Sequence, residues 1–216
     1  MPRPRRTAVR DKWKMKKWYK VVAPPLFGNA LLGTTPADDP DKLIGRVLEV
    51  TLYDLTGEFT HVHIKLYFQI ERVEGDTAYT RFKGHELLRD YIKSLTRRKS
   101  SKIQGIFDVW TKDGYGLRIT VITFTSFRCK TSQKKAIRKI MKEIVEKRAS
   151  ESTLDELIQA MIFSENENSL VREIESEARK IYSIRKVEVY KSKLLYIKTD
   201  EGIKKAVIVS PLQQRS

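Results

Sequence analysis

The sequence predicts an α+β fold: an antiparallel curled sheet, or a partly closed β-barrel or sandwich, followed by a helical segment and a C-terminal β-hairpin. Three observations lead to this prediction. Apolar and polar residues alternate in several stretches before residue 130, which is typical of half-buried strands. From Thr131 onward, apolar residues recur at helical spacing instead. Alternation returns only near residue 187.

The chain of 216 residues is long enough for one large domain or two small ones. We expect a basic, disordered extension over residues 1–17, a mainly antiparallel β domain over 18–130, and a helical segment with its closing hairpin over 131–216. The last part either forms a unit of its own or packs on the β domain.

Turn residues divide the alternating half of the chain into strands. The predicted strands cover residues 43–55, 62–70, 77–82, 103–110 and 117–127. Gly57 follows the first strand, and Gly75-Asp76 turns the second strand into the third. Residues 84–95 can form a short helix. Asp113-Gly114 lies between the last two strands, and this dipeptide is the strongest short-range signal for a β-hairpin.

Three amphipathic stretches predict the helical segment. Residues 131–148 place apolar side chains along one face and basic side chains along another. Thr153 and Glu156 have the spacing of a capping box, which predicts the start of a second helix. A third helix is predicted over 170–181, and residues 187–190 and 194–197 are expected to form the closing hairpin.

The charge of the helical segment reverses over residues 151–180, which hold eight acidic residues against three basic ones. We therefore expect these helices to face solvent or a basic protein, while RNA contacts gather elsewhere.

Charge is the dominant global feature of the chain. Forty-three lysines and arginines against twenty-seven acidic residues give a formal net charge of +16. A basic excess of this size attracts polyanions, of which nucleic acid is the commonest and an anionic membrane is the competitor. No apolar run approaches the roughly 18–20 residues needed to span a bilayer, and the N-terminus lacks the apolar core of a signal peptide. We therefore expect a soluble, cytoplasmic protein with no membrane partner.

The first candidate RNA-binding cluster is the N-terminal segment. Residues 1–20 hold nine basic residues and one acid, and residues 13–20 interleave lysines with aromatic side chains. Aromatic rings can stack on unpaired bases while lysines neutralise phosphates. In the alternative interpretation, Trp18 and Tyr19 anchor the segment on the core and the lysines are merely solvated. The residues expected to bind RNA are Arg3, Arg5, Arg6, Arg10, Lys12, Trp13, Lys14, Lys16, Lys17 and Trp18.

Two further basic clusters follow. One surrounds residues 97–102 and contains small serines that allow close approach to phosphate, although a solvated loop would have the same composition. The other crosses a predicted strand-to-helix junction at Thr131, where a helix N-terminus offers free amide donors. Lysine in a first helical turn opposes the helix dipole, so two lysines there are more easily understood with an anion nearby. The candidate residues are Arg89, Lys93, Arg97, Arg98, Lys99 and Lys102 in the former cluster, and Arg128, Lys130, Lys134, Lys135, Arg138 and Lys139 in the latter.

Catalytic and cofactor-binding constellations are missing from the sequence. His61 and His63 are expected to be exposed on one face of a strand, where two ligands do not make a zinc site. Cys129, the only cysteine, cannot form an intramolecular disulfide and is expected to be a small buried hydrophobe. We find no phosphate loop, nucleophile elbow or cofactor fingerprint.

The sequence therefore predicts a protein that is not an enzyme and holds no cofactor and no metal. Two alternatives stay open. One is an RNA-processing or modification factor without an obvious active site, and the other is a binder of double-stranded DNA.

Several segments, in order from Trp18 to Met141, resemble a known family. They are WYK at 18–20 with APPLF at 23–27, RFKGHEL at 81–87, DYIKSL at 90–95 with Arg97-Arg98, TKDGY at 111–115, and TSQ at 131–133 leading to IRKIM at 137–141. Together they resemble the archaeal and eukaryotic small-subunit ribosomal protein family S-three-Ae, also named eukaryotic-type S-one. The chain lacks the longer tails of eukaryotic members, so it is similar to the archaeal form.

This resemblance implies a structural constituent of the small ribosomal subunit with no catalytic role. It implies binding to small-subunit ribosomal RNA on the platform, near the messenger RNA exit and the 3′ end of the ribosomal RNA. Neighbouring platform ribosomal proteins are the implied protein partners, and messenger RNA near the exit is a further candidate. No homo-oligomer is expected.

Overall fold

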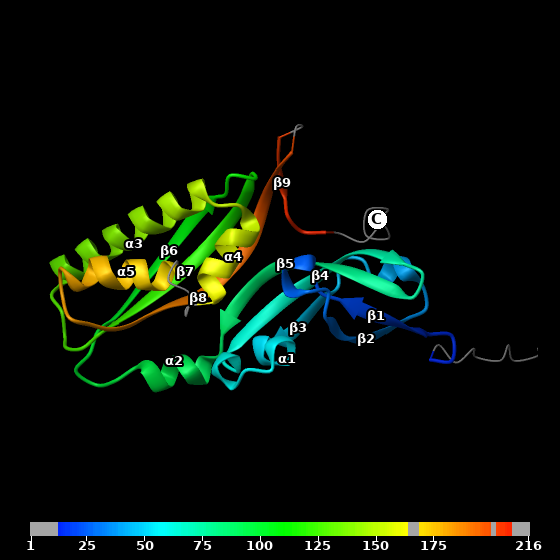
Figure 1. Ribbon diagram of the computed structural model, residues 1–216, viewed down its shortest axis with the longest axis horizontal. Helices are drawn as coiled ribbons and strands as arrows, with labels where there is room; N and C mark the ends of the chain where they lie inside the picture. Colours follow the sequence, from blue (N-terminus) through cyan, green and yellow to red (C-terminus); the bar gives the residue numbers. More distant parts are fainter. Residues whose placement is uncertain (1–12, 164–168, 200–201, 209–216) are drawn as a thin grey trace, which may run out of the picture. The chain divides into compact units, whose positions relative to one another are not determined.

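The computed structural model describes residues 13–163, 169–199 and 202–208 (Figure 1). Within these ranges, nine strands form a mixed, curled and unclosed sheet, accompanied by five α-helices. The predicted α+β class is confirmed, but the sheet is mixed rather than wholly antiparallel and does not close into a barrel. None of the described helices combines the length and apolar composition needed to cross a membrane.

The chain forms two compact units. Among the described residues, unit 1 comprises 13–46, 69–81 and 208, and unit 2 comprises 47–68, 82–163, 169–199 and 202–207. The predicted domain boundaries after residues 17 and 130 divide the chain into parts that would fold independently. They stay a prediction.

Unit 1 contains two strands that the sequence pattern did not predict. β1 (Lys17–Val22) pairs antiparallel with β2 (Leu31–Ala37). β1 also runs parallel to the first residues of β5 (Thr77–Leu87), and this parallel pairing makes the sheet mixed. Tyr19 and Val21 of β1 are buried in the core of the unit. The remaining elements of unit 1 are the last residues of β4 (Ile64–Glu74) and two short 3-10 helices, Pro25–Phe27 and Pro40–Lys42.

Unit 2 is built on long antiparallel strands. β6 (Lys102–Trp110) pairs with β7 (Tyr115–Thr125), which pairs with β8 (Ile184–Thr199). β9 (Gly202–Lys205) forms a hairpin with the end of β8. The hairpin predicted around Asp113-Gly114 is confirmed as the β6–β7 pair.

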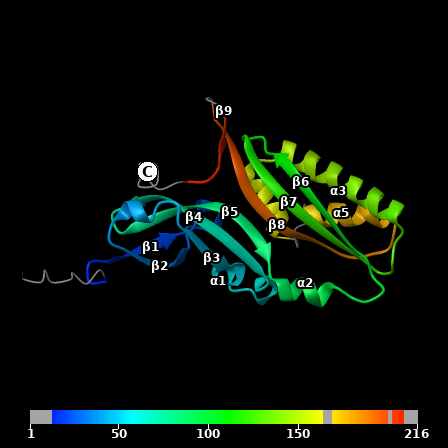
Figure 2. The ribbon, with the colours of Figure 1, turned by 180° about the vertical axis from the view of Figure 1, so that it is seen from behind.

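Three helices lie along one face of this sheet: α3 (Thr131–Glu151), α4 (Leu154–Ile162) and α5 (Leu170–Arg179) (Figure 1). The predicted capping box at the start of α4 is confirmed, because Thr153 and Glu156 each bond the other's backbone amide, at 2.9 and 3.4 Å. The opposite side of the sheet, with β6 and β7 in front of the helices, is seen in Figure 2. The packed core between sheet and helices includes the fully buried residues Ile103, Leu117, Ile119, Val121, Ile137, Met141 and Ile174.

The strand predicted over 43–55 is confirmed only over Val47–Thr51, because residues 43–46 precede the strand in a turn and residues 52–55 form a helix. β3 (Val47–Thr51) pairs with β4 and then gives way to α1 (Leu52–Thr56). The reason is local: Thr51 and Asp54 form a capping box, with Thr51 N donating to the Asp54 carboxylate at 3.1 Å and Asp54 N donating to Thr51 Oγ1 at 3.3 Å. This pair of bonds satisfies the amides of a helix start, so the chain leaves the strand there.

The helix predicted over 84–95 begins only at α2 (Arg89–Leu95), because residues 84–87 continue β5. Gly84 explains the continuation. A Cβ at this position would lie 2.2 Å from the Ser192 carbonyl oxygen, so only glycine allows β5 to approach β8 this closely.

The predicted C-terminal hairpin exists as β8 with β9, but its predicted strands are wrong, because residues 187–190 and 194–197 both belong to the single strand β8. The polar residues Lys191, Ser192 and Lys193 resemble a turn in sequence. In the structure Ser192 is buried and bonds the amide of His85 at 3.2 Å, and Lys191 pairs with Glu86. These contacts to β5 keep the backbone extended through the polar stretch.

Candidate nucleic-acid interface

Two of the three predicted basic clusters meet at one end of the sheet of unit 2. β6 begins there, β7 ends there and β8 begins there. Ser101 joins the two clusters: its amide donates to Thr125 Oγ1 at 2.9 Å, and its hydroxyl accepts the Cys129 amide at 3.2 Å. We call this surface the basic sheet end. It carries the predicted residues Arg97, Arg98, Lys99, Lys102, Arg128, Lys130, Lys134, Lys135 and Arg138.

The loop between α2 and β6 presents three of these cations on a defined turn. Lys99 adopts a positive φ of 62°, a conformation that non-glycine residues seldom hold without support. The Ser100 hydroxyl supplies support by donating to the Arg97 carbonyl at 2.7 Å. Arg97, Arg98 and Lys99 are therefore exposed side chains on a hydrogen-bonded turn rather than on an unstructured loop.

The cations of the basic sheet end lack acidic partners. Within the described residues, no ion pair involves Arg97, Arg98, Lys99, Lys102, Arg128, Lys130, Lys134 or Lys135. Some cations elsewhere are paired, as Arg118 is with Asp108 and Arg179 is with Glu175. Unpaired like charges repel one another, and their mutual repulsion would be relieved by an external anion.

Three predicted residues have partners of their own. Lys93 lies 3.4 Å from Asp90 and Lys139 lies 3.8 Å from Glu143, while Arg138 donates to the Gln104 carbonyl at 3.0 Å. Arg89, at the start of α2, is exposed. Arg89, Lys93 and Lys139 border the basic sheet end, and the acidic partners of Lys93 and Lys139 reduce the unbalanced charge there.

The first turn of α3 offers amide donors to the same surface. This turn contains no acidic residue. Within the part of the chain that the structure describes, no side chain accepts a hydrogen bond from the amides of Thr131 and Ser132. Gln133 Oε1 instead accepts the amide of Lys130 at 2.9 Å. A helix of 21 residues concentrates positive dipole at this end, which makes it a seat for phosphate.

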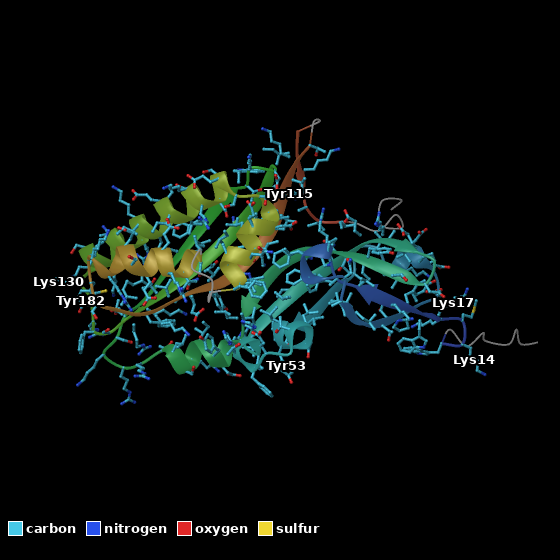
Figure 3. The ribbon with its side chains drawn as sticks, in the orientation of Figure 1. Lys14, Lys17, Tyr53, Tyr115, Lys130 and Tyr182 are labelled. Atoms are coloured by element: carbon cyan, nitrogen blue, oxygen red, sulfur yellow. The ribbon has the colours of Figure 1, made fainter. Side chains whose placement is uncertain are left out.

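Sequence reasoning missed two aromatic residues at the basic sheet end. Phe127 was assigned to a strand, but β7 ends at Thr125 and the Phe127 ring is 68% exposed. Tyr182 comes from the turn between α5 and β8 and donates its hydroxyl to the Arg128 carbonyl at 3.1 Å; Figure 3 shows it beside Lys130. An exposed Phe next to Arg128 was a usable signal, whereas Tyr182 reaches this place only through the pairing of β7 with β8.

The N-terminal cluster lies in unit 1 and is described by itself. Arg3, Arg5, Arg6, Arg10 and Lys12 lie outside the described residues. Trp18 is 64% exposed on β1 while its neighbour Tyr19 is buried, so Tyr19 anchors this strand and Trp18 does not. Lys16 lies over the ring of Trp13, with its Nζ 3.7 Å from the ring centroid. Lys14 and Lys17 are exposed.

The histidines are less exposed than predicted. His61 is buried in a 3-10 helix (Phe59–His61), and His63 is half-buried against Tyr91. His85 is 1% exposed and lies between Ser192 Oγ, at 2.7 Å, and the Val189 carbonyl, at 3.1 Å. Burial lowers the pKa of both His63 and His85.

Together the histidines border a pocket of about 370 Å³ that Glu188 also lines. In the described part of the chain, no three His, Cys, Asp or Glu side chains are placed to hold a metal ion.

Comparison with known proteins places this chain among ribosomal proteins. The sequence model of the Ribosomal S3Ae family matches residues 5–198. The small ribosomal subunit protein eS1 of Aeropyrum pernix is 70% identical over 208 residues, which cover 96% of this chain and 97% of that protein. The eS1 proteins of Staphylothermus marinus and Sulfurisphaera tokodaii are 67% and 54% identical over 213 and 190 residues. These matches cover 99% and 88% of this chain, and 99% and 96% of those proteins.

Proposed function

The chain belongs to the ribosomal S3Ae family, and on this premise we propose that it is a structural, RNA-binding constituent of the small ribosomal subunit. Its relatives carry the name small ribosomal subunit protein eS1, which supports a role in translation and a place in the cytoplasm. The family is a structural component of the ribosome rather than an enzyme.

One observation supports ribosomal RNA as the ligand: the basic sheet end. Its two cation clusters lie about 30 residues apart in sequence and are joined through Ser101. Exposed cations without acidic partners, free helix amides and the ring of Phe127 together match a folded RNA, which offers closely spaced phosphates and unstacked bases. The Arg97 loop and the start of α3 would bind the phosphate backbone of the RNA, while the N-terminal cluster of unit 1 forms a second contact with the RNA.

We further propose the location that membership of the family implies. The protein would bind on the platform of the small subunit, near the messenger RNA exit and the 3′ end of the ribosomal RNA. Neighbouring platform proteins would be its protein partners, and messenger RNA near the exit a transient one.

Salt dependence tests the electrostatic part of this proposal. Arg97→Gln/Arg98→Gln removes two unpaired cations from the basic sheet end. Affinity for small-subunit ribosomal RNA, measured over a salt series, should weaken, and the slope of log Kd against log salt should fall by about 1.4–1.8, because each lost phosphate contact removes roughly 0.7–0.9.

The matched control is Lys142→Gln/Lys147→Gln, which removes two exposed cations from α3, one of them 3.6 Å from Glu146. Its slope should stay that of the unaltered protein. Equal losses in both variants would mean that affinity follows net charge alone. An affinity that is nearly flat between about 50 and 200 mM salt would contradict the proposal.

A further inference from the structure

The other end of the same sheet carries an exposed aromatic surface that the basic sheet end does not use. Trp110 ends β6 and Tyr196 lies on β8, with Gly116 of β7 paired to both. The eleven residues of β7 separate the two ends by about 33 Å. Figure 3 shows Tyr115 and Lys130 at these opposite ends. We call residues 110–116, 196–198 and 203–205 the hairpin end.

The two rings form a continuous platform. Their centroids are 6.2 Å apart and their planes differ by 26°. A Cβ on Gly116 would lie 3.1 Å from the Trp110 ring and 3.1 Å from the Tyr196 Cβ, so the glycine allows the indole to lie on the strand. Trp110 stays 42% exposed and Tyr196 stays 40% exposed, so both rings remain open to a ligand.

A pocket of about 350 Å³ opens beside Trp110, lined by Thr111, Lys112, Gly114, Lys198 and Ile203. Its size lies in the range of small-ligand sites. Backbone bonds fix its walls: Thr111 N donates to the Tyr115 carbonyl at 2.9 Å, and Lys198 N donates to the Gly114 carbonyl at 2.8 Å. The pocket is therefore formed before any ligand arrives.

The charge around the platform is positive. Lys112, Lys198 and Lys205 are exposed, and none of them forms an ion pair within the described residues. Two acids that the structure describes on this part of the sheet are engaged. Asp113 accepts the amide of Leu154 at 3.1 Å, and Asp108 binds Arg118 at 2.6 Å.

We propose that the hairpin end is a further RNA site, which binds a short run of unpaired nucleotides. One base stacks on the outer face of Trp110 and a neighbouring base contacts Tyr196 or enters the pocket, while the three lysines neutralise phosphates. Stacking rings flanked by unpaired lysines are what single-stranded RNA requires. The inference rests on the proposed function only for RNA as the partner, because the site lies away from the basic sheet end.

Tryptophan fluorescence tests the proposal. In Trp13→Phe/Trp18→Phe, Trp110 is the only tryptophan of the chain, so its emission reports on this site. An oligo(A) of about eight nucleotides should quench this emission on titration. An abasic ribose-phosphate oligomer of the same length should not, because stacking needs a base. Quenching by both oligomers alike, or by neither, would overturn the proposal.

Variants in the same background locate the contacts. Lys112→Gln/Lys198→Gln should weaken oligo(A) binding by about tenfold. Tyr196→Ala should do the same and Tyr196→Phe should not, with thermal melts reporting the folding of both. Lys142→Gln/Lys147→Gln is the charge-matched control and should bind oligo(A) like the parent.

Arg97→Gln/Arg98→Gln separates this proposal from the proposed function. It should leave the quenching of Trp110 intact while weakening ribosomal RNA binding. If oligo(A) leaves Trp110 unaffected and a protein neighbour covers the ring in assembled subunits, the hairpin end is a protein contact and the inference is wrong.

Discussion

At the scale of single residues, the buried His85 makes stability depend on pH. Burial lowers the pKa of its imidazole from 6.5 to about 4, so the folded protein keeps the ring neutral. The unfolded chain, in contrast, takes up a proton as the pH falls below 6.5. The stabilising contribution is therefore complete above pH 6.5 and is lost progressively between pH 6.5 and about 4.

We expect His85 alone to cost the protein about 2 kcal/mol of unfolding free energy between about pH 7.5 and about pH 5. Urea unfolding of the unaltered protein and of His85→Asn at the two pH values checks this. The variant should be less stable at the higher pH, because asparagine cannot fill the site between Ser192 and Val189. The difference between the two proteins should shrink by about 2 kcal/mol at the lower pH. A difference of equal size at both pH values would contradict the buried, neutral histidine.

At the scale of elements, a change at the start of α3 should affect the stability of the protein and its binding to RNA in opposite directions. A carboxylate in the first turn would stabilise the helix by about 0.3–1 kcal/mol, since it complements the dipole. The same charge would repel phosphate from the seat that we propose there.

Ser132→Glu should therefore raise the free energy of unfolding by about 0.5 kcal/mol and weaken ribosomal RNA binding by about tenfold or more. Chemical denaturation and filter binding measure the two effects. Ser150→Glu adds the same charge near the other end of the helix, where it opposes the dipole, and should leave RNA binding unchanged. A Ser132→Glu protein that binds RNA as tightly as the unaltered one would exclude this helix start from the interface.

Elements that depend on local pattern were predictable, and elements that depend on distant partners were not. Alternation around Asp113-Gly114 predicted the β6–β7 hairpin, and helical spacing predicted α3 to α5. The polar stretch around Ser192 made one continuous strand, β8, look like two strands in the sequence. Ser192 is buried only because it packs against β5, which lies more than a hundred residues away in the sequence. α1 is the opposite case: a capping pair of two residues outweighed an alternating pattern.

The candidate site divides in the same way. Composition located the cations at Arg97 and Lys130, since charge is visible in the sequence. Their union into one surface was not predictable, because it needs the pairing of β6 with β7 that brings Ser101 to Thr125 and Cys129. The contribution of Tyr182 depends on the further pairing with β8.

At the scale of the whole molecule, the proposed function makes a prediction for the cell. The protein should sediment with the small ribosomal subunit through a sucrose gradient of native lysate, at the salt concentration of the cytoplasm. Arg97→Gln/Arg98→Gln should shift part of the protein to the top of the gradient, while Lys142→Gln/Lys147→Gln should not. A slow-sedimenting pool alone, with none in the subunit fraction, would contradict a ribosomal constituent.

Ser101 lies beneath the surface proposed to bind RNA. This serine precedes β6 and bonds Thr125 of β7 and the segment before α3, so an RNA held by both clusters would span the same junction from outside. Opening the sheet at this point would then require release of the RNA, so binding and closure reinforce each other.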